Sequence, residues 1–193
     1  MRTIISIAVV LAFLMMAGCE NSPSPKPRGY FRIDLPQHNY QQFDTTYPFG
    51  FEYPVYTEIQ TQGANIREPY WFNVHYPDFD GTVYFSYKPV KNNLARLVDD
   101  SHEFVGKHMA KASAVDERVI IDDKEDKYGL IFEIEGSETA SPYQFYLTDS
   151  TRHFLRGALY FNNKPNNDSL APVINFVQED MEHLIRTFYW KEP

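Results

Sequence analysis

The stretch YWFNVHYPDFDGTVYFSYKP, from Tyr70 to Pro89, reads as two β-strands joined by a tight turn. Aromatic and β-branched residues alternate with polar ones on both sides of the turn, which is typical of strands in a sheet. Between them, DFDG at residues 78–81 supplies the aspartates and the glycine that tight turns favour. We therefore predict a β-hairpin here, and with it an antiparallel sheet.

Strand patterns continue on both sides of this hairpin. The remaining candidates are YFRIDL at 30–35, PFGFEYP at 48–54, RVIID at 118–122, GLIFEIEG at 129–136, PYQFYLT at 142–148 and RHFLRGALYF at 152–161. The last four form two pairs, the first joined by the short charged sequence DKEDK and the second by DST. Connections of this length predict further hairpins.

Two segments have the apolar spacing of amphipathic helices. The first runs from Asn93 to about Ala112, with apolar residues at Leu94, Leu97, Val98, Val105, Met109 and Ala112. The second runs from about Ala171 to Tyr189, with Ser169 or Asp168 as its cap and Pro172 in its first turn. Its buried stripe is predicted to be Val173, Val177, Met181, Leu184 and Phe188.

The order of these elements predicts an α+β domain, with a mostly antiparallel β-sheet and two amphipathic helices packed on it. A doubly wound parallel sheet is disfavoured because it needs a helix between nearly every pair of strands. Apolar residues occupy both faces of the strands, so either the helices cover opposite faces or one face is an aromatic surface that binds a partner. The candidate residues of such a partner-binding surface are Tyr30, Arg32, Tyr84, Tyr146 and Tyr160.

The first 18 residues read as a lipoprotein signal peptide. Arg2 gives a positive start, and the apolar run Ile4–Met16 is too short to span a bilayer. Gly18 precedes Cys19, the only cysteine among 193 residues, so we predict cleavage between them and attachment of lipid to the thiol. An ordinary signal peptide with a stray thiol and a short uncut anchor are the alternatives. Both leave an unpaired reactive cysteine without a role.

A spacer and one domain follow the predicted cleavage site. Residues 19–29 contain three prolines, a composition that favours extended chain over a folded core. Residues 30–193 are predicted to form a single globular domain without disulfides, since Cys19 has no partner. No acidic run follows Cys19, which favours a lipoprotein facing the periplasm over one displayed on the cell surface.

The sequence contains no motif for catalysis or for a metal or other cofactor. HExxH, CxxC, GxSxG, SxxK and phosphate-loop patterns are absent. Glu179 and His183 are spaced to form a solvated pair on one helix face, and Asp149 and His153 flank a turn. We therefore predict a protein that is not an enzyme, with no cofactor and no metal site.

Charge and composition leave three functional classes open. The net charge of −8 argues against nucleic acid as a partner and against electrostatic docking on anionic lipid. The favoured class is an assembly or scaffold protein that binds other envelope proteins. The alternative is a periplasmic carrier of a lipid or other apolar ligand, which predicts a closed apolar cavity of roughly 300 Å³ or more. An enzyme with an unrecognised site would need converging titratable groups in a cleft.

Several segments resemble the GldD gliding-motility lipoproteins of the Bacteroidota. They are SYKPVKNNLARLVDDSHEFVGKHMAKA, ASPYQFYLTDSTRHFLRGALYF, KPNNDSLAPV and LIRTFYW, together with PKPRGYFRIDLP after the cysteine. The resemblance spans about Pro25 to Trp190. It implies an envelope lipoprotein, anchored in a membrane by fatty acids such as palmitate, that gliding and type IX secretion require. It also implies partners among the envelope proteins of that machinery, no known reaction, and Cys19 as the lipid attachment point.

The lipid anchor is testable by removing the thiol. We expect Cys19→Ala to leave the protein either soluble or unprocessed, because no acyl chain can then be attached. Membrane fractionation and mass measurement of the chain check this outcome. Continued membrane attachment with normal processing would contradict the anchor.

Overall fold

The computed structural model describes residues 33–61 and 68–191. From Ile33 onward, these residues belong to one compact unit. The predicted signal peptide and spacer, with Gly18, Cys19, Tyr30 and Arg32, lie outside the described residues.

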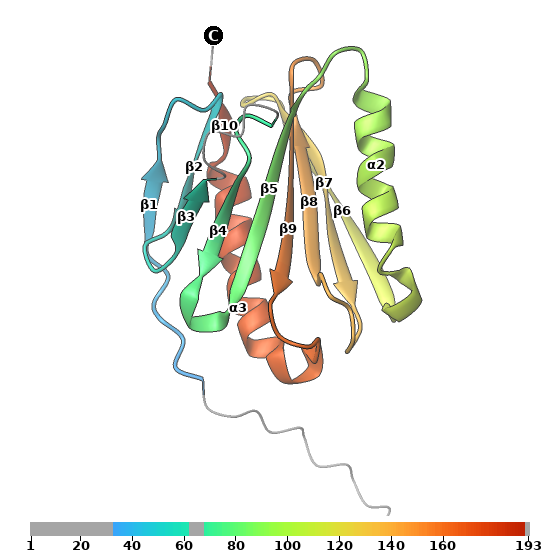
Figure 1. Cartoon of the computed structure of the whole chain (residues 1–193). Coiled ribbons are helices and arrows are strands. Elements are labelled where there is room, and N and C mark those ends of the chain that lie inside the picture. The colour runs from blue at the N-terminus through green and yellow to red at the C-terminus, as the bar shows by residue number, and fades with distance from the viewer. Residues whose placement is uncertain (1–32, 62–67, 192–193) are drawn as a thin grey trace, which may run out of the picture. The chain divides into compact units, whose positions relative to one another are not determined.

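A seven-stranded antiparallel sheet is the centre of the fold (Figure 1). Its strand order is β3-β4-β5-β9-β8-β7-β6. The strands are β3 (Glu58–Thr61), β4 (Phe72–Tyr76), β5 (Gly81–Pro89), β6 (Ala114–Asp122), β7 (Lys127–Glu135), β8 (Tyr143–Thr148) and β9 (His153–Phe161). Together with two helices, this sheet confirms the predicted α+β class.

The predicted hairpin is formed by β4 and β5. Phe72 pairs with Phe85 and Tyr76 pairs with Gly81. A short 3-10 helix, Pro77–Phe79, makes the turn, and Asp80 completes it in the left-handed region with φ of 49°. Aspartate tolerates this region better than most residues, so the DFDG sequence suits the turn.

A second, three-stranded sheet joins the two ends of the described chain. It has the order β1-β2-β10, with β1 (Tyr40–Phe43), β2 (Phe49–Pro54) and β10 (Tyr189–Trp190). The prediction of β2 is confirmed. The strand predicted at 30–35 is wrong for its described part, because residues 33–35 have no strand structure and the first strand begins at Tyr40. Pro36, which cannot donate to a ladder, follows directly.

The two predicted helices are present with shifted ends. The first, α2 (Leu94–Gly106), is followed by a 3-10 turn at Met109–Lys111. The second, α3 (Asn167–Thr187), begins earlier than predicted, so Pro172 lies in its second turn and Asn166 stands at its cap position. Asn167 explains the early start, since its Nδ2 donates to the carbonyl oxygens of Gly136 (2.8 Å) and Thr139 (2.9 Å). These tertiary bonds fix the first turn of α3 in place of a local cap.

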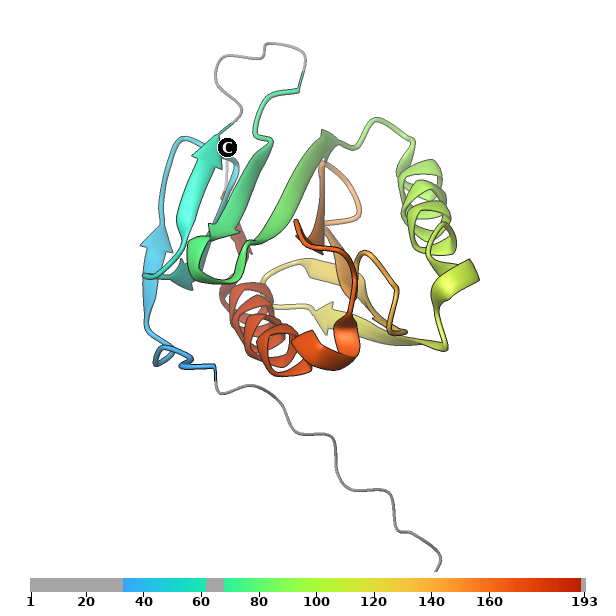
Figure 2. The ribbon, with the colours of Figure 1, turned by 60° about the horizontal axis from the view of Figure 1, so that its bottom comes forward.

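The two helices cover opposite faces of the sheet (Figure 2). Neighbouring residues of one strand show this, because Phe145 packs in the cluster that contains Val177 and Met181 of α3, while Tyr146 packs with Leu97 of α2. Side chains alternate along a strand, so both faces of β8 are buried. Because α2 packs on the second face of the sheet, this face is not left bare as a whole for a partner. The alternative of an entirely exposed aromatic face is therefore excluded. The cluster under α2 takes its strand residues from β6 to β9.

Two glycines differ in what surrounds them and provide a test of the sheet packing. A Cβ on Gly129 of β7 would lie 1.9 Å from the carbonyl oxygen of Tyr146, whereas one on Gly106 of α2 would have nothing within 4 Å. We expect Gly129→Ala to lower the free energy of unfolding by about 2–3 kcal/mol, because backbone must move. Gly106→Ala should raise it slightly, by at most about 0.5 kcal/mol, since alanine favours helix and Gly106 is the last residue of α2. Urea unfolding of both variants measures the difference, and equal stabilities would contradict the close approach of β7 and β8.

Candidate functional site

The described residues of the predicted partner-binding surface differ in exposure. Tyr84 of β5 is 42% exposed, and its ring meets Tyr160 of β9 edge-on at 5.8 Å between centroids. Tyr146 is only 7% exposed, because it lies beneath α2 and stacks on Phe154 at 5.2 Å. Tyr146 therefore belongs to the core and is removed from the predicted surface. Tyr30 and Arg32 lie outside the described residues.

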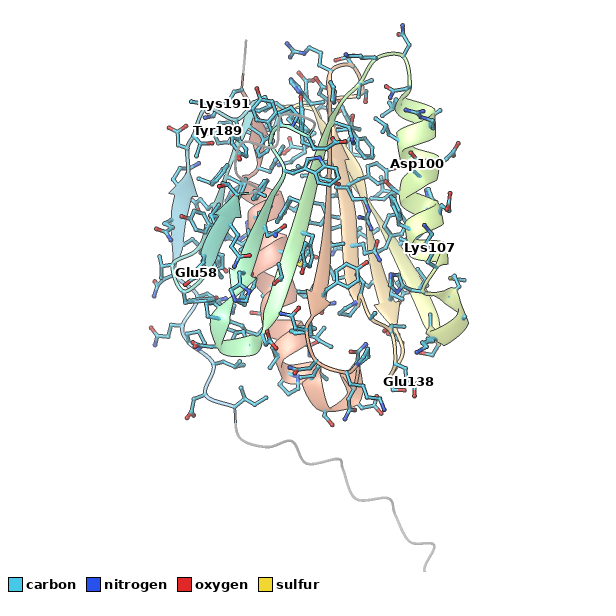
Figure 3. All side chains as sticks on the ribbon, viewed as in Figure 1. Glu58, Asp100, Lys107, Glu138, Tyr189 and Lys191 are labelled. Carbon is cyan, nitrogen blue, oxygen red and sulfur yellow. The ribbon has the colours of Figure 1, made fainter. Side chains whose placement is uncertain are left out.

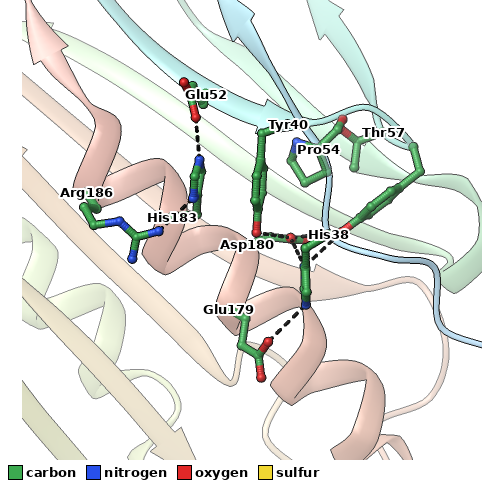
Figure 4. A network of polar contacts seen from close by, with 10 residues as sticks. His38, Tyr40, Glu52, Pro54, Thr57, Glu179, Asp180, His183 and Arg186 are labelled. Atoms are coloured by element: carbon green, nitrogen blue, oxygen red, sulfur yellow. Dashed lines mark hydrogen bonds and ion pairs between the residues drawn. The ribbon is translucent and has the colours of Figure 1, made fainter.

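A buried carboxylate, Asp180 of α3, collects hydrogen bonds from three side chains far away in the sequence (Figure 4). The side chain of Asp180 is fully buried. The Tyr56 hydroxyl lies 2.9 Å from Oδ1 and 2.8 Å from Oδ2, and the Tyr40 hydroxyl donates to Oδ1 at 3.1 Å. His38 Nδ1 lies 2.7 Å from the same Oδ1. Asp180 thus fixes the segment before β1, the start of β1 and the loop after β2 on one helix.

Two neighbours of Asp180 on α3, Glu179 and His183, also make polar contacts with the N-terminal part of the domain. His38 Nε2 lies 3.0 Å from Glu179 Oε2, and His183 Nε2 lies 2.6 Å from Glu52 Oε2 of β2. The prediction that Glu179 and His183 pair with each other is therefore wrong. Each of them instead contacts a residue from the N-terminal part of the domain. The spacing of residues within one helix cannot reveal such contacts.

Ring stacking reinforces the same contacts. The Tyr40 ring lies parallel to His183 at 3.5 Å between centroids, and the His38 ring stacks on Phe176 at 4.3 Å. Ile33 also packs against the main core cluster. The chain that enters the domain is consequently held by apolar, stacking and hydrogen-bonding contacts together.

Burial sets the electrostatics of this network. It raises the pKa of Asp180 above its ordinary value, although hydrogen bonds from Tyr56, His38 and Tyr40 oppose the shift. Burial, together with the charge of Asp180, also raises the pKa of Tyr40 and of Tyr56. Both hydroxyls therefore keep their protons and remain donors. Because the Asp180 side chain is closed to solvent, the network can fix backbone segments but offers no carboxylate to a substrate.

The sequence held one signal for Asp180. Val173, Val177, Met181 and Leu184 lie on one face of α3 and are buried, and Asp180 falls on that same face. An acidic residue at a core-facing helix position must find donors, because an unpaired buried charge is costly. Which side chains act as donors could be identified only from the tertiary fold.

The turn before β9 behaves as the sequence predicts. Asp149 Oδ1 accepts hydrogen bonds from the backbone N–H groups of Thr151 (3.0 Å), Arg152 (2.7 Å) and His153 (2.8 Å). The His153 ring is directed elsewhere, with Nδ1 2.7 Å from the Tyr87 hydroxyl. Asp149 therefore shapes the turn.

Two features that bear on function are absent from the described residues. Residues 33–61 and 68–191 contain no group of three or more His, Cys, Asp or Glu side chains placed to hold a metal ion. Within the same ranges, no helix combines the length and apolar character that crossing a bilayer requires.

Comparisons with known proteins identify one family. A family model described as gliding motility lipoprotein GldD matches residues 20–190. No curated protein matches the chain. Among solved structures, the solution structure of cyanobacterial PsbP (CyanoP) from Synechocystis sp. PCC 6803 aligns with a TM-score of 0.47 and 12% sequence identity, covering 86% of this chain and 99% of that one.

Removal of the Asp180 carboxylate tests the network. We expect Asp180→Ala to lower the free energy of unfolding by about 3 kcal/mol or more, because the hydroxyls of Tyr40 and Tyr56 then lose their acceptor. The matched control is Glu179→Ala, whose side chain is 70% exposed and which should cost below about 1 kcal/mol. Denaturant unfolding measures both, and similar losses for the two variants would refute a special role of Asp180.

The raised pKa of Asp180 also predicts a pH dependence. A folded-state pKa above the unfolded one contributes stability that is complete below the unfolded value, near 3.8, and is lost as pH rises through the folded value. Asp180→Asn lacks this titration. Unfolding of both proteins from pH 4 to pH 8 should show the wild type losing stability relative to Asp180→Asn as pH rises. A difference independent of pH would be evidence against the raised pKa.

Proposed function

This chain belongs to the GldD family of gliding motility lipoproteins, and we propose from this premise that it is a non-enzymatic assembly component of the machinery for gliding and type IX secretion. The observation that carries the proposal is the family match over residues 20–190. A lipoprotein family implies a lipid-anchored protein of the cell envelope. The role in secretion, the absence of catalysis and the periplasmic orientation are parts of the proposal.

If the chain is anchored through Cys19, the contacts of His38 and Tyr40 with Asp180 have a mechanical role. A lipid on Cys19 would hold the chain at its front, so that any tension between membrane and domain enters near Ile33. The domain meets that tension with the His38 and Tyr40 contacts to Asp180 and with the pairing of β1 to β2. We propose that these contacts keep the domain folded and oriented while the lipid holds it at the membrane.

An assembly role requires exposed surface that other proteins can bind. The edge strand β6 offers Val119 at 65% exposure and Ile121 at 71%. β6 is the last strand in the order of its sheet, and no strand among the described residues pairs with its outer edge. Exposed apolar side chains on an open strand edge support a role in binding other envelope proteins. Tyr84 and Tyr160 remain as predicted surface residues on β5 and β9.

Crosslinking in intact cells tests the assembly role. A photo-reactive benzophenone amino acid at Ile121 should form adducts with another protein that gliding requires, because the side chain points away from the core. The same amino acid at Lys124, in the neighbouring exposed turn, is the control for random collisions. Adducts of equal yield at both positions would count against a specific surface on β6.

A paired substitution links that surface to movement. We expect Val119→Ser together with Ile121→Ser to reduce gliding speed several-fold while changing the free energy of unfolding by less than about 1 kcal/mol. Val55→Ser removes another valine that is 51% exposed and should leave gliding unchanged. Normal gliding by the double variant would exclude β6 as the binding surface.

A further inference from the structure

A groove of about 320 Å³ lies between α2 and the strands β4, β5 and β9. Trp71, Tyr84, Phe104 and Phe154 give it aromatic walls, and Arg156 of β9 lines it as well. Asp100, labelled on α2 in Figure 3, also lines the groove. The volume is at the lower end of the range for small-molecule sites. Because the groove is partly open and carries charged groups, it differs from the closed apolar cavity of a lipid carrier.

Arg156 has an unusual set of neighbours. Its Nη2 donates to Gln144 Oε1, and its guanidinium lies 4.6 Å from the centre of the Phe104 ring. Burial lowers the pKa of Arg156, although the Tyr160 hydroxyl opposes the shift. Across the described part of the chain, no carboxylate lies within 4.0 Å of this guanidinium.

Several other cations among the described residues do have acidic partners. Lys88, which shares the groove, contacts Glu68 at 2.5 Å, and Arg152 contacts Asp149 at 3.4 Å. Arg118 pairs with Glu182. In a chain with a net charge of −8, a half-buried arginine without an acidic partner is unexpected. Arg156 is therefore not paired with a carboxylate of the described residues, and Asp100, the acid that lines the same groove, makes no ion pair with it.

Gln144 gives a second, independent indication. It is 1% exposed, and its Oε1 is occupied by Arg156. Its Nε2 is buried and has no hydrogen-bond partner. Buried amide donors normally find an acceptor, so the polar cluster at Arg156 is deficient in acceptors as well as in negative charge.

We propose that the groove binds a small organic anion. Its carboxylate or other oxyanion would be held by Arg156, which Gln144 positions, and its flat apolar body would lie against Phe104, Tyr84 and Trp71. Guanidinium groups bind oxyanions through fixed, charge-assisted hydrogen bonds, and aromatic walls favour a flat apolar partner. This site goes beyond the assembly role and does not depend on a protein partner.

Fluorine NMR on the lipoprotein in lipid nanodiscs tests the proposal with 4-(4-fluorophenyl)butyrate as the probe. We expect line broadening beyond that of empty nanodiscs, and at least ten-fold weaker binding of the matched neutral amide. Arg156→Met, which keeps the apolar stem, should weaken the carboxylate at least ten-fold. Lys124→Met makes the same change in net charge outside the groove and should leave binding unchanged.

Phe104→Ala alters a side chain that is 42% exposed, so it should fold and weaken the probe several-fold even if Arg156→Met is unstable. Inorganic phosphate should compete only weakly, because it lacks an apolar body. Equal binding of acid and amide, unchanged binding by both groove variants, or no binding at millimolar probe would overturn the proposal.

Discussion

The seven-stranded sheet is apolar on both faces along β7, β8 and β9, and each of these faces needs a cover. Phe145 and Tyr146, or Phe154 and Leu155, are consecutive and all buried, so one helix cannot shield both members of either pair. α3 covers one face and α2 covers part of the other. Because α2 packs over β6 to β9 only, the same face stays open over β4 and β5. The groove at Arg156 follows from this incomplete cover.

The smaller sheet gives the domain a different kind of constraint. β2 pairs with β1 on one side and with β10 on the other, so both ends of the described chain meet on one strand. Asp180 then fixes the entering segment on α3, the helix that leads directly into β10. A domain closed in this way resists opening from either end, which suits the proposed anchoring of the chain by a lipid on Cys19.

Local sequence was sufficient for the elements with strong patterns. The hairpin, both helices and the four later strands follow from alternation or helical spacing, although α2 ends at Gly106, well before the predicted Ala112, and Tyr189 belongs to β10 and not to α3. β1 and β3 were missed because their side chains are mostly exposed and polar, so that pairing partners alone make them strands. The pairs of His183 with Glu52 and of Glu179 with His38 join residues more than a hundred positions apart, and no local spacing reveals such contacts.

Two clusters of buried and half-buried polar groups in this domain differ in how far their hydrogen bonds are satisfied. The carboxylate of Asp180 is surrounded by donors from three segments, and its network is complete within the chain. Arg156 and Gln144 form the opposite case, because Gln144 Nε2 has no acceptor and no carboxylate among the described residues forms an ion pair with Arg156. Buried polar groups are normally paired, so an incomplete cluster requires an explanation. That Arg156 borders an open, aromatic groove is the reason to propose a ligand as this explanation.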